Sequence, residues 1–490
     1  MTSFRVALAY SYLNKYLTVI IYFITTVTLA RLLTPADIGV YTVAAVFVGL
    51  GHLLREFGIN EYIVQEKELT PDRIRAAFTL NMLFGWSIAL ILFFARTPIG
   101  NFYNSEGVRE VIGLLCINFL LVPIGAITFA HIRREMRFQH LMVIQVASAI
   151  TSSLVGILSA LAGEAYRSLV WSAIAGTATS VLLTFVFRSK EMLLLPGIRE
   201  IPHVFAFCRY AGSRQLITHA GQTSPDWILG KLLDMSAVGL YSRGLGTISI
   251  FNKAFLEALW GVILPHFSRQ LRDGALDKDQ YLFLVECVTA VAWPFFATLA
   301  VLSEPVIRLL FGDQWLESAP VLRVLCLGAV LVYTNVLMDQ MLISAGHIRL
   351  SFRIIVILQV LTVAAVFLSA PNGLIWVAGA IMAVNFIQLC TYQLVGQRIF
   401  EISFQAFARI YIRNALLTCV SVISPLVAAL TLDDVQLVFL PYLSAVIAAT
   451  VLAWTAGIWL LKSSLFAEMI KALTYVKALR RPRASSGSSG

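Results

Sequence analysis

The sequence predicts an all-α polytopic membrane protein with about fourteen transmembrane helices, because of its composition, its long apolar runs and its uneven distribution of Lys and Arg. Of the 490 residues, 59% are hydrophobic and only 13% are charged, and the mean hydropathy is +0.81. Soluble proteins carry about twice this charged fraction. A soluble core could not bury so much apolar surface, so the lipid bilayer must solvate much of the chain.

Fourteen apolar runs are long enough to cross a bilayer, which takes roughly 20 residues of helix. Turn-forming pairs separate several of them, among them Thr34-Pro35, Thr70-Pro71 and Pro196-Gly197. An even number of spans places both termini on the same side of the membrane. The runs cover residues 11–33, 38–58, 76–96, 109–131, 141–162, 166–188, 204–230, 238–265, 281–303, 319–345, 350–370, 373–397, 409–431 and 435–461.

The positions of Lys and Arg indicate which side that is. The N-terminal segment, the C-terminal tail and every second loop together contain 27 of these residues, whereas the opposite loops contain 7. Cytoplasmic loops of membrane proteins carry such an excess of positive charge. We therefore expect both termini in the cytoplasm. The net charge of +10 is assigned to the cytoplasmic surface and to anionic lipid headgroups rather than to a nucleic-acid partner.

An internal repeat relates two parts of the chain. Residues 29–41 (LARLLTPADIGVY) and 229–241 (LGKLLDMSAVGLY) share a basic residue, a Leu pair, and then Gly and Tyr at identical spacing. Both copies start on the cytoplasmic side, so the repeat is parallel and its pseudo-twofold axis runs along the membrane normal. Carriers are commonly built in this way, with the substrate path between the repeats.

The repeat predicts the domain organisation. Two six-helix lobes, residues 1–190 and 191–400, precede two extra C-terminal helices in residues 401–462. Residues 463–484 form a basic cytoplasmic tail, and residues 485–490 (SSGSSG) are expected to be an appended flexible linker. The six cysteines lie in or beside apolar runs without CxxC or Cys/His spacing, so we expect neither a metal nor a cofactor.

Polar residues inside the spans are the candidate functional residues, because a charge at the bilayer centre costs about 2.5–3.5 kcal/mol on insertion scales. An excess of cations there predicts an anionic cargo. The predicted substrate-binding residues are Arg214, Arg243, Lys253, Gln222, Lys15 and Asn14. The predicted counter-ions or ion-coupling residues are Asp226, Glu257, Asp339 and His219. Pro225 is expected to bend the run 204–230, and His52, Arg55 and Glu56 are expected at the cytoplasmic surface.

Other interpretations of these residues stay open. Lys253 and Glu257 are four residues apart and can neutralise each other on one helix face. Arg214 and Arg243 lie nearer the ends of their spans, from where a long side chain can reach the headgroups. His219 can be a hydrogen-bonded structural residue.

Several segments resemble the polysaccharide transporter family of Wzx-type flippases. They are residues 30–41 (ARLLTPADIGVY), 57–59 (FGI), 63–70 (IVQEKELT), 239–242 (GLYS) and 304–315 (EPVIRLLFGDQW). They occur in the family's order, and the resemblance extends over roughly residues 1–400. The family belongs to the multidrug/oligosaccharidyl-lipid/polysaccharide exporter superfamily, whose fold has two six-helix lobes, often with two extra helices.

The resemblance implies a function. The chain would flip undecaprenyl-diphosphate-linked oligosaccharide repeat units from the cytoplasmic to the periplasmic leaflet of a bacterial inner membrane. It would do so by alternating access through a cationic central cavity, for surface or exopolysaccharide synthesis. Membrane lipids, a polysaccharide polymerase and chain-length machinery would be its partners. Nothing in the sequence demands an oligomer, so a monomer is expected.

Two alternatives within the same superfamily stay open, a peptidoglycan-precursor (lipid II) flippase and a multidrug antiporter. Antiporters for cationic drugs usually carry carboxylates in the cavity, whereas the candidates here include several cations. An enzyme is not expected, because the predicted outward loops are short. They contain no nucleophile–base or metal-ligand spacing.

Overall fold

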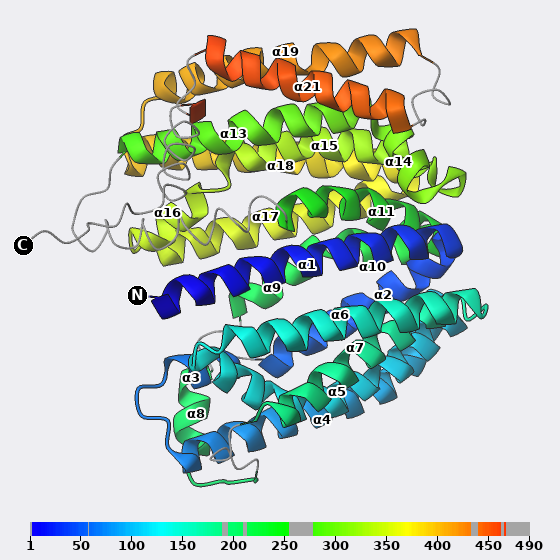
Figure 1. Cartoon of the computed structure of the whole chain (residues 1–490), viewed down its shortest axis with the longest axis vertical. Helices are drawn as coiled ribbons and strands as arrows, with labels where there is room; N and C mark the ends of the chain where they lie inside the picture. The colour runs from blue at the N-terminus through cyan, green and yellow to red at the C-terminus, as the bar shows by residue number, and fades with distance from the viewer. Residues whose placement is uncertain are drawn as a thin grey trace, which may run out of the picture. The chain divides into compact units, whose positions relative to one another are not determined.

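The computed structural model describes residues 2–56, 58–188, 195–208, 213–253, 278–432, 440–461 and 465–466. Within these ranges the chain forms helices and no strand, which confirms the all-α fold class (Figure 1). Contacts between residues group the chain into two compact units. Unit 1 comprises Met1–Gly261, Leu310–Val321 and Phe352–Ile381, and unit 2 comprises Val262–Leu309, Leu322–Ser351 and Met382–Gly490. The predicted six-helix lobes stay a prediction.

Unit 1 begins with eleven helices. They are α1 (Thr2–Leu32), α2 (Pro35–Glu56), α3 (Ile59–Gln65), α4 (Pro71–Tyr103), α5 (Glu106–Arg134), α6 (Phe138–Leu161), α7 (Arg167–Val186), α8 (Ile201–Cys208), α9 (Ser213–Gln222), α10 (Ser224–Leu232) and α11 (Met235–Phe251).

The ends of these helices follow from local sequence signals. The Thr70 hydroxyl accepts a hydrogen bond from the Arg73 amide at the start of α4, where Pro71 needs no hydrogen-bond acceptor. The Asp234 carboxylate accepts one from the Ala237 amide, at 2.7 Å, at the start of α11. The break predicted from Thr70-Pro71 is therefore a helix cap, and Asp234 is the cap of α11.

Small residues hold the helices of unit 1 close together. Helices α4 and α5 pack side by side, as do α6 and α7 (Figure 1). A Cβ atom at Gly176 of α7 would lie 3.0 Å from the Cβ of Ser152 on α6, and one at Gly85 of α4 would lie 2.4 Å from Pro123 of α5. Membrane helices pack through such residues, since lipid provides no hydrophobic force that would bring helices together.

The two copies of the sequence repeat meet where α2 crosses α11. A Cβ atom at Gly39 would lie 1.7 Å from the carbonyl oxygen of Met235, the first residue of α11. Reciprocally, a Cβ atom at Gly239 would lie 1.9 Å from the carbonyl oxygen of Pro35, the first residue of α2. The two contacts involve equivalent positions of the repeat, because Gly39 and Gly239 are 200 residues apart and so are Pro35 and Met235. The repeated Gly is therefore required because each helix lies directly against the backbone of the other.

Unit 2 is built from the later helices, some of which contribute residues to both units. The remaining described elements are α13 (Lys278–Val301), α14 (Ser303–Phe311), η2 (Asp313–Trp315), α15 (Ser318–Asn335), α16 (Met338–Ser344), α17 (Ile348–Ser369), η3 (Ala370–Asn372), α18 (Leu374–Ile399), α19 (Phe404–Thr431) and α21 (Leu440–Leu460).

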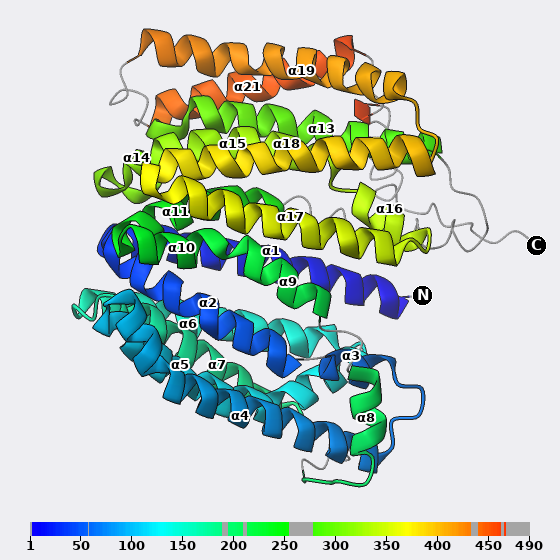
Figure 2. The same ribbon diagram turned by 180° about the vertical axis from the view of Figure 1, so that it is seen from behind.

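Buried polar side chains connect α13, α19 and α21 within unit 2, where α19 and α21 lie side by side (Figure 2). The fully buried Asn414 amide donates to the Thr289 hydroxyl at 2.6 Å and to the Glu286 carbonyl at 3.2 Å. The Trp454 indole donates to the Ala290 carbonyl at 2.8 Å. Such bonds add to packing where the surroundings are apolar.

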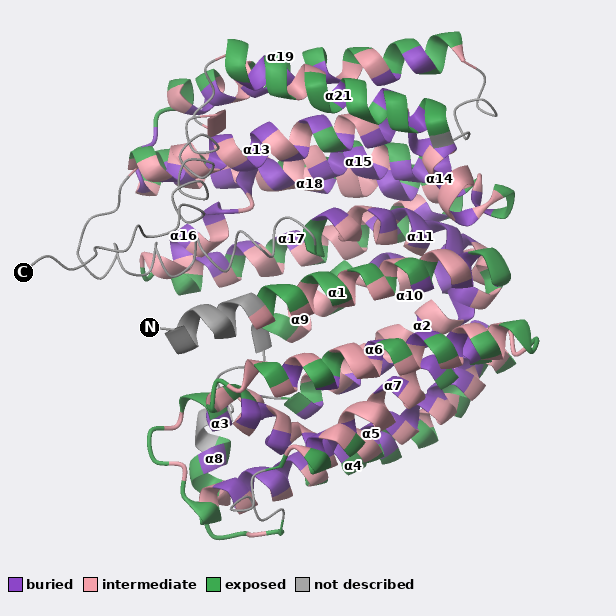
Figure 3. Ribbon diagram, in the orientation of Figure 1, coloured by how far each residue is buried: buried purple, intermediate pink, exposed green. Residues whose placement is uncertain are grey.

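Twelve helices of the described residues are long and apolar enough to cross a membrane. Many Leu, Ile and Phe side chains on these helices are exposed, and Figure 3 shows many exposed residues along α19 and α21. Lipid contact explains this exposure, which would be costly in water.

The other two predicted spans differ from single long helices. The run 204–230 begins in α8, which packs against α3 and α4, and continues as the separate helices α9 and α10. The expected bend at Pro225 is therefore a break at Thr223, where α9 has ended and α10 has not begun. The run 238–265 forms α11, and its part beyond residue 253 lies outside the described residues.

Candidate functional site

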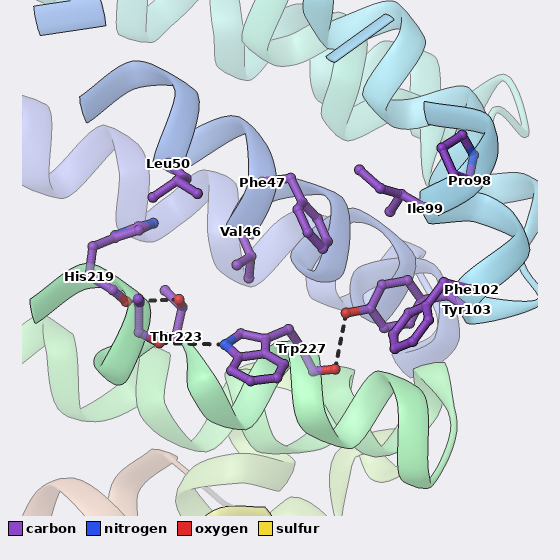
Figure 4. A pocket seen from close by; sticks show the side chains of 11 residues that line it. Val46, Phe47, Leu50, Pro98, Ile99, Phe102, Tyr103, His219, Thr223 and Trp227 are labelled. Atoms are coloured by element: carbon purple, nitrogen blue, oxygen red, sulfur yellow. Dashed lines mark hydrogen bonds between the residues drawn. The ribbon is translucent and has the colours of Figure 1, made fainter. Parts of the chain in front are cut away.

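A pocket of about 470 Å³ lies in unit 1 beside the break between α9 and α10 (Figure 4). Helices α2 and α4 form one wall, and α9 and α10 form the other. The pocket therefore lies between residues of the predicted lobe 1–190 and residues of the predicted lobe 191–400. Its lining residues are Val46, Phe47, Leu50, Pro98, Ile99, Phe102, Tyr103, His219, Ala220, Thr223 and Trp227.

The break is stabilised by side-chain hydroxyls that donate to backbone carbonyls, and one of them replaces a missing backbone hydrogen bond. Pro225 has no amide hydrogen, so it cannot donate to the carbonyl of Gly221 four residues earlier. The Ser224 hydroxyl donates to that carbonyl instead, at 2.7 Å. The Thr223 hydroxyl donates to the His219 carbonyl at 2.8 Å. Broken helices in membranes persist only where such partners exist.

Trp227 connects the broken helix to α4. Its indole donates to the Ala220 carbonyl at 3.4 Å, across the break. Its carbonyl accepts a hydrogen bond from the Tyr103 hydroxyl at 3.1 Å, as Figure 4 shows. Both bonds hold α10 in place along one wall of the pocket.

The pocket is mainly apolar, and its polar side chains are those of His219, Thr223 and Trp227 on the broken helix and of Tyr103 on α4. His219 points toward α2, where a Cβ atom at Gly49 would lie 3.0 Å from its Nε2. That nitrogen is buried and makes no hydrogen bond within the described part of the chain. Transporter binding sites commonly form at discontinuous helices, where backbone and polar groups become available to a substrate. The pocket can therefore hold an apolar group beside the polar break.

Arg243 has a different environment from the predicted open cavity. Its side chain is buried in α11, and its guanidinium carbon lies 4.7 Å from the ring centroids of both Phe311 and Trp315. The Trp315 indole donates to the Ala30 carbonyl at 2.8 Å. Aromatic rings stabilise a desolvated guanidinium by cation–π attraction. Arg243 thus has structural partners, it does not line the pocket, and its substrate-binding role stays a prediction.

Most of the other predicted residues lie apart from the pocket. Asp226 is on α10, and its Oδ1 is buried without a hydrogen-bond partner among the described residues. Gln222 and Lys253 are exposed. The Asn14 amide donates to the Gln145 side chain at 2.5 Å and so connects α1 to α6.

Three further predicted residues complete the set. Asp339, in unit 2, accepts hydrogen bonds from Ser351 at 2.5 Å and from Tyr392 at 3.5 Å. Lys15 is half-buried on α1. The side chain of Arg214 and the whole of Glu257 lie outside the described residues.

The sequence interpretation missed Thr223 and Trp227, which position the broken helix. A signal for them was present. Pro225 inside an apolar run leaves the Gly221 carbonyl without its amide donor, and Thr223 and Ser224 stand directly before it. The apolar wall from α2 had no such signal, since Val46, Phe47 and Leu50 are typical residues of any span.

The fold and the pocket define a class of protein, a polytopic α-helical membrane transporter rather than an enzyme. Among solved structures, the lipid II flippase MurJ in an inward closed conformation matches 94% of this chain and 100% of its own, with a TM-score of 0.75 and 13% identity. At this identity the likeness concerns the fold.

Family membership follows from the sequence comparisons. The family model described as "Polysaccharide biosynthesis protein" matches residues 28–320, more than half of the chain. The chain is similar to the succinoglycan biosynthesis transport protein ExoT of Rhizobium meliloti, at 25% identity over 91% of this chain and 89% of that protein. It is also similar to the teichuronic acid biosynthesis protein TuaB of Bacillus subtilis, at 22% identity over 68% and 71%. The chain belongs to this polysaccharide biosynthesis family, which confirms the resemblance inferred from its segments.

Proposed function

We propose that the protein flips undecaprenyl-diphosphate-linked oligosaccharide repeat units from the cytoplasmic to the periplasmic leaflet of a bacterial inner membrane. The observation that carries this proposal is the pocket at the broken helix, between segments of the two predicted lobes. The family match and the name of the succinoglycan relative support a polysaccharide precursor as the cargo.

The energetics explain why such a cargo needs a carrier. Each hydroxyl moved into lipid without a partner costs about 1–3 kcal/mol, and an oligosaccharide carries many hydroxyls. Polar side chains along the transport path supply partners for the glycan and the diphosphate, while the prenyl chain stays in lipid or against apolar surface such as that of the pocket. An inside-negative membrane potential favours outward movement of the anion by about 2.3 kcal/mol per charge per 100 mV.

The crossing of α2 and α11 suggests how access alternates. Alternating access requires the two repeats to separate at one membrane face while they stay closed at the other. The reciprocal glycine contacts bring segments of both repeats into direct backbone contact. We assign this crossing to the closed end of the path, and the pocket at the α9–α10 break to the substrate path.

Localisation and coupling follow from the same proposal. Both termini face the cytoplasm, and the carrier works as a monomer that passes its cargo to a polymerase and chain-length machinery. Asp226, with its buried Oδ1, and Asp339 are the candidate residues for coupling to an ion. If the sodium and proton gradients are collapsed and translocation continues unchanged, ion coupling is excluded.

Mass spectrometry of lipid extracts tests the function directly. Cells that lack the protein should accumulate a complete undecaprenyl-diphosphate repeat unit, and the wild-type protein should remove it. Arg214→Ala and Trp227→Ala should restore the accumulation at normal protein levels, because one removes the predicted cation and the other a pocket wall. Arg398→Ala, at an exposed position near the end of α18, is the matched control.

The same extracts distinguish the alternatives. Accumulation of the peptidoglycan precursor in the deletion cells would favour the lipid II flippase. No accumulation of any lipid-linked glycan, together with increased sensitivity to cationic drugs, would favour the multidrug antiporter. Either outcome overturns the proposed cargo.

A further inference from the structure

A second cavity of about 420 Å³ lies within the predicted lobe 1–190 and is lined by residues of α1, α2, α3, α5, α6 and α7. It differs from the pocket at the broken helix, because hydroxyl groups make up much of its wall. These are the side chains of Ser148, Ser152, Thr177, Ser180 and Thr184. Arg55, Glu56 and Asn60 lie at the end of the cavity formed by α2 and α3.

Hydrogen bonds between neighbouring helices build part of this wall. The Ser148 hydroxyl donates to the Gly176 carbonyl at 2.7 Å, and the Ser152 and Ser172 hydroxyls lie 2.9 Å apart. The Thr184 hydroxyl donates to the Val181 carbonyl at 2.6 Å. An oxygen that donates in this way keeps lone pairs that can accept a hydrogen bond from a ligand.

Two hydroxyls of α7 remain available for any partner. Thr177 and Ser180 line the cavity, and neither makes a hydrogen bond to another described residue. They lie three residues apart and therefore on the same face of the helix. Each can both donate to and accept from a polar ligand.

Arg55 provides a charged group with an unused donor. Arg55 is buried, with an exposed fraction of 3%. Its guanidinium donates to the Asn81 side chain at 3.2 Å and to the Glu56 carboxylate at 3.0 Å. Its Nε has no hydrogen-bond partner among the residues that the structure describes. A buried donor without a partner is costly, so a shift of the side chain that turned this donor toward a ligand oxygen in the cavity would be favourable.

We propose that this cavity binds one sugar ring of the transported glycan, an inference that rests on the proposed function. A sugar ring presents many neutral hydroxyls that both donate and accept, as the wall does. Glu56 balances the charge of Arg55, so the cavity has no excess positive charge that would select a diphosphate. Tyr22 and Phe129 add aromatic surface, and the volume lies within the usual range of about 300–1,000 Å³ for small-ligand sites.

Ligand-observed NMR on the purified full-length protein tests the proposal. Saturation transfer is measured with glucose, galactose and N-acetylglucosamine, alone and with inorganic diphosphate as competitor. At least one sugar should receive saturation from the protein, and diphosphate should not displace it. Binding should weaken about threefold or more in Thr177→Val and in Ser180→Ala, as expected for the loss of one neutral hydrogen bond.

Thr179→Val is the matched control on the same helix. Thr179 does not line the cavity, and its hydroxyl donates to the Ala175 carbonyl. Its variant should bind sugar as the wild-type protein does, and all variants should elute and melt normally. The proposal is overturned if sugar binding weakens equally in the Thr177 and Thr179 variants, or if no sugar receives saturation from the protein. Displacement of the sugar by diphosphate would instead assign the cavity to an anion and would also overturn the proposal.

The lipid extracts of the deletion cells keep this inference separate from the proposed function. If the deletion cells accumulate the repeat unit but the NMR experiment shows no sugar binding, only the sugar site fails. If they accumulate no lipid-linked glycan, the proposed function fails whatever the NMR result.

Discussion

The glycine crossing between α2 and α11 gives a sharp prediction, because a single methyl group added at either glycine can fit only if the backbone of the other helix moves away. An alanine at Gly39 would place its Cβ 1.7 Å from the Met235 carbonyl oxygen, and Cβ atoms essentially never approach closer than 3.0 Å. The helices must therefore separate by about 1.3 Å (3.0 less 1.7) at this point. The same change at Gly239, with 1.9 Å to the Pro35 carbonyl, requires about 1.1 Å.

The energetic cost follows from the kind of atom that is displaced. Overpacking a well-packed site costs about 1–3 kcal/mol, and a rigid backbone carbonyl places these two sites at the upper end. The better helix propensity of alanine returns at most about 1 kcal/mol. We expect each variant to lose about 2 kcal/mol of stability. The double variant should lose less than the sum, because the first methyl group already separates the helices for the second.

Thermal unfolding of the purified protein in detergent measures the effect. Gly39→Ala and Gly239→Ala should both melt earlier than the wild-type protein and should restore less polysaccharide to deletion cells. Gly246→Ala on α11 is the control, because nothing lies within 4 Å of a Cβ at that position. It should be neutral or slightly stabilising. If Gly39→Ala and Gly239→Ala melt at the same temperature as the Gly246→Ala control, the helices do not pack through these glycines.

Two further predictions follow, one for unit 1 and one for unit 2. Burial raises the pKa of Glu66, but hydrogen bonds from His203 and a backbone amide, with the charge of Arg73, hold it below its usual value. Glu66→Gln should therefore lower the free energy of unfolding by about 0.5–1 kcal/mol at neutral pH. When melting is measured as a function of pH, the difference between variant and wild type should vanish as the pH falls through the depressed pKa of Glu66. In unit 2, Asn414→Leu removes the hydrogen bond to Thr289. It should lower the free energy of unfolding by about 1 kcal/mol, measured by urea or thermal unfolding. An unfolding midpoint equal to that of the wild-type protein would contradict this prediction.

The sequence alone was sufficient to predict elements that depend on local composition. Apolar runs of helix length predict spans whatever their neighbours are, since lipid forces each span to satisfy its own backbone hydrogen bonds. Pro225 likewise predicts a bend, because it lacks an amide hydrogen, and the structure has a break there. The repeat of residues 29–41 in residues 229–241 was visible from spacing, and the family could be inferred from such segments.

The tertiary structure decided which of these residues meet. Gly39 and Gly239 are 200 residues apart, and their reciprocal contacts depend on the crossing of two helices. Arg243 and Arg55 are equally polar in sequence, but one stacks against aromatic rings and the other lines a cavity of hydroxyl groups. Contacts between distant segments depend on how whole helices pack, so the order of residues along one helix does not contain them.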